Sequence, residues 1–149
     1  MTLDPAIAEK IRTSFAAQGL MATLGARIEE VAAGRVRISA PIVPETAQQM
    51  GFAHAGLAFS IGDSAAGYAA LTVMEAGMEV VTAEMKIHLL APARGAHLEA
   101  EGRVIRAGRR LAVVGADVFA TDGTERRHVA TLMGSMMPIA PSRPSARAR

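Results

Sequence analysis

Residues 48–68, QQMGFAHAGLAFSIGDSAAGY, contain the feature around which this chain is organised. A polar, glycine-containing entry leads into a run of small and apolar residues, which predicts a helix over residues 55–73. One carboxylate, Asp63, falls in the middle of that run. Burying a carboxylate among apolar residues costs free energy unless the carboxylate is paired with another group or has a function. The stretch therefore predicts a core helix with a functional acid, the alternative being a structural acid paired with an arginine or a helix end.

Strand patterns flank this helix on both sides. Before it, residues 22–41 predict two strands joined by a turn at Ala33-Gly34. After it, alternating residues predict four strands, over residues 78–91, 97–106, 111–120 and 125–137. Simple alternation in the first of these places Thr82 on the less apolar face, opposite Met85 and Ile87. One apolar helix among strands predicts an α+β fold, in which an antiparallel sheet wraps around the long helix.

A short helix is predicted ahead of the first strands, over residues 5–18. Asp4 can cap its start, Pro5 suits its first turn, and Gly19 can end it. A chain of 149 residues is typical of one domain, which we place at residues 1–138. Residues 139–149 are rich in Pro, Ser, Ala and Arg, which predicts a disordered tail.

The composition excludes several kinds of protein. The absence of cysteine excludes disulfides, thiol catalysis and cysteine-based zinc sites, and the histidines have no metal-ligand spacing, so no metal is expected. Aromatic residues are only 3% of the chain, too few to stack on bases, so no nucleic-acid partner is expected. We expect neither a signal peptide nor a membrane span, because no suitable apolar run is present, and the expected location is the cytoplasm.

Several segments, taken in order, carry a known pattern. They are Gln48, His54-Ala55-Gly56, Gly62-Asp63-Ser64-Ala65, the strand 81–92 and the Gly-Arg hairpin 102–111. This order resembles the hotdog-fold acyl-CoA thioesterases, specifically their PaaI-like (phenylacetate-degradation) branch. The resemblance implies a hotdog fold, with an antiparallel sheet wrapped around one long central helix. It also implies hydrolysis of an aryl, medium or short acyl-CoA to free acid and CoA, with no cofactor.

The predicted catalytic residues all lie in or just before the long helix. Asp63 would act as the general base, or as a nucleophile that forms an anhydride. A helix N-terminus offers free N–H groups, so the amides of Ala55 and Gly56 are the predicted oxyanion hole. Gln48 would position the thioester or the water. His54 would contact the thioester or, as an equal alternative, only fix the loop.

The predicted residues for binding the substrate or CoA are less closely tied to the pattern. They are Ser64, Gly67, Thr82, Arg106, Arg109 and Arg110. The arginines are assigned to CoA phosphates by the resemblance, and a solvated hairpin is their alternative. This sequence departs from the family pattern at two positions. Ala55 stands where the family has glycine, and Gly67 stands where several relatives have a Ser or Thr that orients water. Ser64 is no simple substitute, because it is adjacent to Asp63 in sequence and its side chain points about 100° around the helix from that acid.

The spacing of the candidate residues predicts a shared site. His54 and Asp63 are nine residues apart, which is about 13 Å along a helix axis. One chain cannot bring both to one thioester carbon, whereas two antiparallel copies of the helix can. We therefore expect a homodimer in which Gln48, His54 and Ala55 come from one chain and Asp63 from its partner. The resemblance adds a dimer of dimers.

Two other functions are compatible with the same residues. A hotdog hydratase or dehydratase would act on acyl thioesters without releasing a thiol. A non-catalytic hotdog protein would bind acyl-CoA without turning it over, and Ala55 and Gly67 are the residues that raise this alternative. The acyl group is not specified, although the content of Met and Ala indicates an adaptable apolar pocket.

Overall fold

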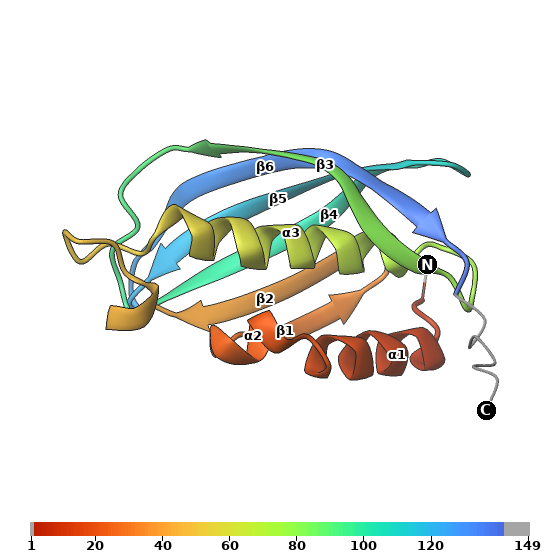
Figure 1. The fold of residues 1–149 in the computed structure, drawn as a ribbon, viewed down its shortest axis with the longest axis horizontal. Helices are drawn as coiled ribbons and strands as arrows, with labels where there is room; N and C mark the ends of the chain where they lie inside the picture. The colour runs from red at the N-terminus through yellow and green to blue at the C-terminus, as the bar shows by residue number, and fades with distance from the viewer. Residues whose placement is uncertain (1, 142–149) are drawn as a thin grey trace, which may run out of the picture.

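The computed structural model describes residues 2–141, which form a curved antiparallel sheet around one long helix (Figure 1). The helix is α3, Ala55–Leu71. The six strands are β1 Arg27–Ala32, β2 Arg35–Pro41, β3 Glu79–Leu89, β4 His97–Ala107, β5 Ala112–Thr121 and β6 Arg126–Ile139. Their order across the sheet is β1-β2-β4-β5-β6-β3, so β1 and β3 are the edges. This confirms the predicted α+β architecture.

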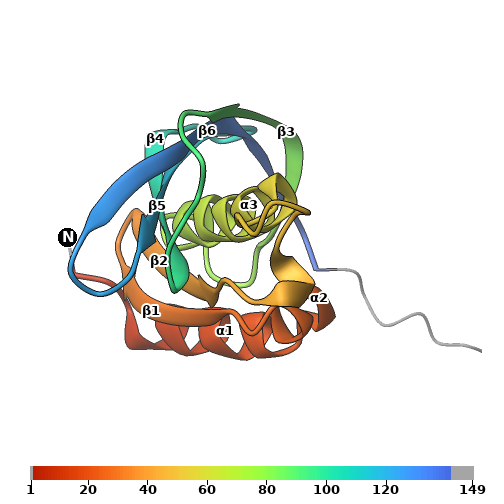
Figure 2. The same cartoon turned by 90° about the vertical axis from the view of Figure 1, so that its left-hand side faces the viewer.

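The long helix is enclosed because it is apolar nearly all round. Most of its residues are buried, and the sheet curves around it (Figure 2). Glycines allow the helix and the sheet to approach each other closely. A Cβ at Gly102 of β4 would lie 2.2 Å from the carbonyl carbon of Ala65, and one at Gly62 would lie 2.9 Å from the methyl groups of Leu132 on β6. Helix and sheet are therefore in direct contact on both of these strands.

The N-terminal segment contains two helices where one was predicted. α1 is Pro5–Ala16, and the Asp4 side chain caps it by accepting a hydrogen bond of 2.8 Å from the Ala6 N–H. Gly19 does not simply end this helix, because it begins a short second one, α2 Gly19–Thr23. The first strand consequently starts later than residue 22. A helix of five residues is too short to show a helical period in the sequence.

The edge strand β3 contains a β-bulge that changes which face its residues occupy. The register with β6 shifts between Thr82 and Glu84. As a result Val80 and Thr82 lie on the face turned toward α3, together with Met85 and Ile87. The assignment of Thr82 to the opposite face was wrong, because one extra residue in a strand reverses the alternation beyond it.

The C-terminal strand β6 runs further than predicted, to Ile139, and so includes the first residue of the expected tail. Residues 142–149 of that tail lie outside the described part of the chain. Among residues 2–141, none of the helices is both long and apolar enough to cross a membrane.

Candidate active site

The predicted catalytic residues line two different pockets of the chain. Gln48, His54 and Ala55 line a pocket of about 460 Å³ at the start of α3, which is also lined by residues 89–93. Asp63 lines a second pocket of about 200 Å³ further along α3, together with Thr82 of β3. No residue lines both. Within one chain, the two halves of the predicted site therefore lie apart, as the nine-residue spacing between His54 and Asp63 requires.

Asp63 lies half-buried on α3 and makes one specific polar contact. Its Oδ1 accepts a hydrogen bond of 2.8 Å from the Thr82 hydroxyl. Burial raises the pKa of Asp63, and the Thr82 hydrogen bond, which favours the charged form, only partly opposes that rise. Among residues 2–141, neither arginine nor lysine pairs with this carboxylate. The alternative of a structural acid paired with an arginine thus has no partner in the described chain.

His54 caps the N-terminus of α3. Its Nδ1 accepts a hydrogen bond of 2.8 Å from the Gly56 N–H. The Gly56 amide is therefore occupied within the chain, which leaves the Ala55 N–H as the amide without a partner among the described residues. An imidazole that accepts at Nδ1 carries its proton at Nε2 when neutral. The end of α3 thus offers two donors, the Ala55 N–H and the His54 Nε2–H.

Gln48 belongs to a tight loop that leads into α3. Its side-chain Oε1 accepts from the Met50 N–H, and its backbone N–H donates to the Phe52 carbonyl at 2.8 Å. Gly51 adopts a φ of +83°, a conformation that favours glycine, at the tip of this loop. The side-chain oxygen is thereby fixed, and the Nε2 group of Gln48 remains as a donor.

The remaining predicted binding residues divide into two groups. Ser64 and Gly67 line the Asp63 pocket, as Thr82 does. A Cβ at Gly67 would lie 3.7 Å from the Met136 Cε, which is ordinary contact, so a side chain would fit there. The arginines of the β4–β5 hairpin are exposed and line neither of the two pockets; they are Arg106, Arg109 and Arg110.

Seven residues that the sequence did not indicate as site residues also line the Asp63 pocket, and three of them form a hydrogen-bonded group. The three are Tyr68, five residues after Asp63 on α3, Ser14 of α1, and Gln18, which lies between α1 and α2. Gln18 Nε2 donates to the Tyr68 hydroxyl at 2.7 Å, and Ser14 Oγ lies 3.1 Å from the same oxygen. The position of Tyr68 after the acid was the only available signal, since the contacts join segments about fifty residues apart.

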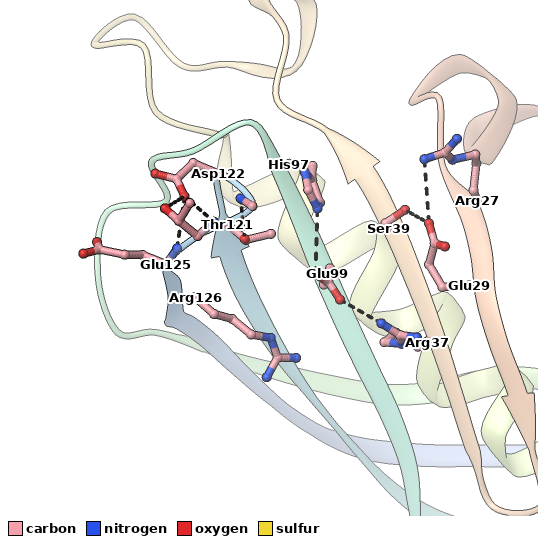
Figure 3. A network of polar contacts seen from close by, with 12 residues as sticks. Arg27, Glu29, Arg37, Ser39, His97, Glu99, Thr121, Asp122, Glu125 and Arg126 are labelled. Carbon is pink, nitrogen blue, oxygen red and sulfur yellow. Dashed lines mark hydrogen bonds and ion pairs between the residues drawn. The ribbon is translucent and has the colours of Figure 1, made fainter.

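Other charged side chains pair across the face of the sheet turned away from α3. Glu99 lies 3.2 Å from Arg37 and 3.8 Å from His97, and Ser39 donates to Glu29 (Figure 3). Partly exposed ion pairs of this kind contribute at most about 1 kcal/mol each. Within residues 2–141 no three His, Asp or Glu side chains cluster as metal ligands would.

Known proteins resemble this chain in both sequence and structure. Residues 50–126 match the family described as the thioesterase superfamily. The chain is 34% identical over 100 residues to a Saccharolobus solfataricus protein whose name marks it as an inferred esterase, a match that covers 67% of this chain and 71% of that one.

Solved structures extend the likeness over nearly the whole chain. A thioesterase family protein from Silicibacter pomeroyi is 41% identical, with a TM-score of 0.88 over 91% of this chain and 99% of that one. The E. coli PaaI protein from the phenylacetic acid degradation operon shares the fold, with a TM-score of 0.83 at 19% identity, over 95% of this chain and 99% of that one. The chain therefore belongs to the thioesterase superfamily, and it is a thioester hydrolase with the hotdog fold.

Proposed function

We propose that this hydrolase cleaves acyl-CoA thioesters with Asp63 as the catalytic carboxylate. The observation that carries the proposal is a half-buried acid that lines a pocket, has a raised pKa, and has no cationic partner among the described residues. A raised pKa brings a carboxylate closer to the working pH, where a general base is most effective. Such perturbed acids in pockets are typical of active sites.

Two chemical roles of Asp63 are consistent with this position. As a general base, Asp63 removes a proton from water while the water oxygen bonds to the thioester carbonyl carbon. The C–S bond then breaks, and CoA leaves as a thiol after taking up the proton. As a nucleophile, Asp63 bonds to the carbonyl carbon itself, the C–S bond breaks, and CoA leaves as a thiolate that takes up a proton. Water then hydrolyses the mixed anhydride, which releases the free acid and restores the Asp63 carboxylate.

The start of α3 supplies the other half of the proposed site. The Ala55 N–H and the His54 Nε2–H would donate to the developing oxyanion, because a helix N-terminus favours negative charge. Gly56 would act indirectly, since its N–H holds the His54 ring in place. The Nε2 group of Gln48 would orient the thioester or the water.

The two halves would meet across a dimer, with Asp63 facing the partner's copy of the His54 pocket. The edge strand β3 supports such a dimer, because its outer edge is unpaired within the described chain. It also exposes large apolar side chains, with Val81 44% and Leu89 59% exposed. An unpaired edge of this length is a template for pairing with a second strand. A further pairing into tetramers rests on the family resemblance.

Coenzyme A phosphates would bind the β4–β5 hairpin. Its arginines are exposed and form no ion pair with the described residues, in contrast to Arg103, which pairs with Asp117 at 2.5 Å. Guanidinium groups that are not already neutralised are suited to phosphate. The free arginines are Arg106, Arg109 and Arg110.

Release of free thiol from a range of acyl-CoA esters tests the proposal. We expect Asp63→Asn to lower turnover by about 10²- to 10⁴-fold, the usual contribution of a general base. Glu9→Gln is the matched control, because Glu9 is an exposed acid on α1 that lines neither pocket. Full activity in Asp63→Asn would disprove the role of this acid. Loss of enoyl-CoA absorbance without thiol release would identify a hydratase, and tight binding without turnover a non-catalytic protein.

Mixing inactive variants tests the shared site. Asp63→Asn and His54→Ala each disable both sites of their own dimer. A mixed dimer of the two has one site with both defects and one intact site. Random mixing should restore about a quarter of the wild-type activity, because half of the dimers are mixed. If mixed dimers form and no activity returns, Asp63 and His54 do not act across subunits.

A further inference from the structure

The pocket beside Asp63 ends on a group of hydrogen-bonding side chains. The Tyr68 hydroxyl accepts from Gln18 Nε2 at 2.7 Å and lies 3.1 Å from Ser14 Oγ. Tyr68 is only 5% exposed, and all three residues line the pocket. Because Ser14 belongs to α1 and Gln18 lies between α1 and α2, the N-terminal helical segment forms part of the pocket wall.

The N-terminal helix α1 is held at this wall by contacts from its middle and from its last turn. Lys10 of α1 lies 3.1 Å from Glu79, which opens β3 and also lines the pocket. Between the Lys10 and Ser14 contacts, Ile11 of α1 is fully buried in the core. The position of α1, and with it the polar end of the pocket, is therefore set by packing as well as by hydrogen bonds.

After these hydrogen bonds form, one donor and one acceptor of the group remain without a partner among the described residues. The hydroxyls of Ser14 and Tyr68 share one hydrogen bond, so one of the two hydroxyl hydrogens has no acceptor among the described residues. The side-chain oxygen of Gln18 likewise has no donor among them. A hydroxyl can donate once and accept, and it satisfies both vacancies together. An alkyl end would displace water from both groups and leave them unpaired, which is unfavourable.

The size and charge of the pocket further limit the kinds of acyl group that it can bind. Its volume of about 200 Å³ is below the roughly 300–1,000 Å³ of drug-sized ligand sites, so it suits a short chain. Tyr68 lies five residues beyond Asp63, about 7.5 Å along the helix axis, a distance that a short acyl chain spans. Asp63 lines the pocket without a cationic partner among the described residues, and its negative charge disfavours an acyl group that ends in a carboxylate.

We propose that Tyr68, held by Ser14 and Gln18, is a specificity-determining residue that selects short acyl groups with a neutral hydrogen-bonding end, such as a hydroxyl. This rests on the proposed function, in which the thioester carbon lies at Asp63 and the acyl chain extends along α3. The acyl pocket is then polar at its far end, in contrast to the adaptable apolar pocket that the composition indicated.

Three CoA thioesters of equal chain length test the selection: hexanoyl-CoA, 6-hydroxyhexanoyl-CoA and adipoyl-CoA. The wild-type protein should have the highest kcat/KM for the hydroxyl ester and the lowest for adipoyl-CoA. Tyr68→Phe keeps the ring and removes the hydroxyl. It should lower the ratio of kcat/KM between the hydroxyl and hexanoyl esters by about two- to tenfold, the effect of one net hydrogen bond, mainly through KM.

Two further variants separate this role from a general loss of stability. Ser14→Ala retains the Gln18–Tyr68 hydrogen bond and should lower the same ratio. Thr23→Ala is the control, because the Thr23 hydroxyl donates to the Gly19 carbonyl on α2 and does not line the pocket. That variant should leave the ratio unchanged. A wild-type ratio of one, unchanged in Tyr68→Phe and Ser14→Ala, would overturn the proposal.

Binding to Asp63→Asn, measured by calorimetry, separates failure of this inference from failure of the proposed function. Preferential binding of the hydroxyl ester by this variant, with no turnover by the wild type, would refute the proposed hydrolysis and support the pocket assignment. Turnover of all three esters with equal affinities would refute the assignment alone. Failure of this variant to bind any of the esters, with no turnover by the wild type, would refute both.

Discussion

A single methyl group at Gly102 should separate the sheet from the long helix. Gly102 lies on β4, where a Cβ would sit 2.2 Å from the carbonyl carbon and 2.3 Å from the carbonyl oxygen of Ala65. Both atoms belong to the backbone of α3, so no side chain can turn away to make room. The contact must lengthen by about 1 Å before it approaches the 3.5–4.0 Å at which carbon atoms attract.

The expected loss of stability and of activity in Gly102→Ala follows from this overlap. Overpacking of a well-packed core costs about 1–3 kcal/mol, and a rigid backbone contact places Gly102→Ala in the upper part of that range. For a chain of about 150 residues, each kcal/mol lowers Tm by about 2–4 °C. The displaced helix carries Asp63, whose hydrogen bond to Thr82 is 2.8 Å long. A misplacement of about 1 Å can lower turnover by about 10²-fold, so activity should fall as well.

Gly67→Ala is the matched control for stability, because it adds the same methyl group to α3 itself. There the new Cβ would lie 3.7 Å from the Met136 Cε, in ordinary contact. Replacing glycine by alanine in a compatible helix stabilises a protein by about 0.4–1 kcal/mol. Urea unfolding followed by circular dichroism, at one fixed protein concentration, measures both variants. Equal unfolding free energies for Gly102→Ala and the wild type would refute the close packing of α3 on β4.

Three more predictions concern the site. Thr82→Val removes the hydrogen bond that lowers the pKa of Asp63, so the acid limb of the kcat/KM profile should move to higher pH. Asp63→Asn should raise the free energy of unfolding at neutral pH. The pKa of Asp63 is raised on folding, so its ionisation removes stability as pH increases, and the difference from the wild type should vanish below about pH 3.8 in urea titrations. Alanine at Arg106, Arg109 and Arg110 together should raise KM about tenfold for acyl-CoA, and not for the acyl-pantetheine ester that lacks the nucleotide phosphates, because charged hydrogen bonds are lost only with CoA.

The order of the elements could be predicted because its signals are local. The run around Asp63 is too long and too rich in alanine for a strand, and the flanking segments alternate as half-buried strands do. The separation of His54 from Asp63 could also be predicted, because the rise of a helix per residue is constant. The structure confirms this separation by placing the two residues in different pockets.

The details of the site depended on contacts that no local pattern records. The bulge after Thr82 is a property of the pairing between β3 and β6, so the alternation of β3 alone placed Thr82 on the wrong face. The Gly56 amide was expected to be free, and it donates to His54 because the loop turns the imidazole back over the helix end. Capping of this kind depends on side-chain direction as well as on residue type.

By itself, the sequence determined the order of the six strands and the long helix, the α+β class and the isolation of one acid within an apolar helix, because periodicity and hydrophobicity act between near neighbours. Only the tertiary structure decided that Thr82 faces Asp63 and that the N-terminal helical segment places Ser14 and Gln18 against Tyr68. These contacts join segments that are 19 to 54 residues apart, and their geometry is set by how the helices and the sheet pack together. The shape and polarity of the pocket beside Asp63 are therefore properties of the packed molecule.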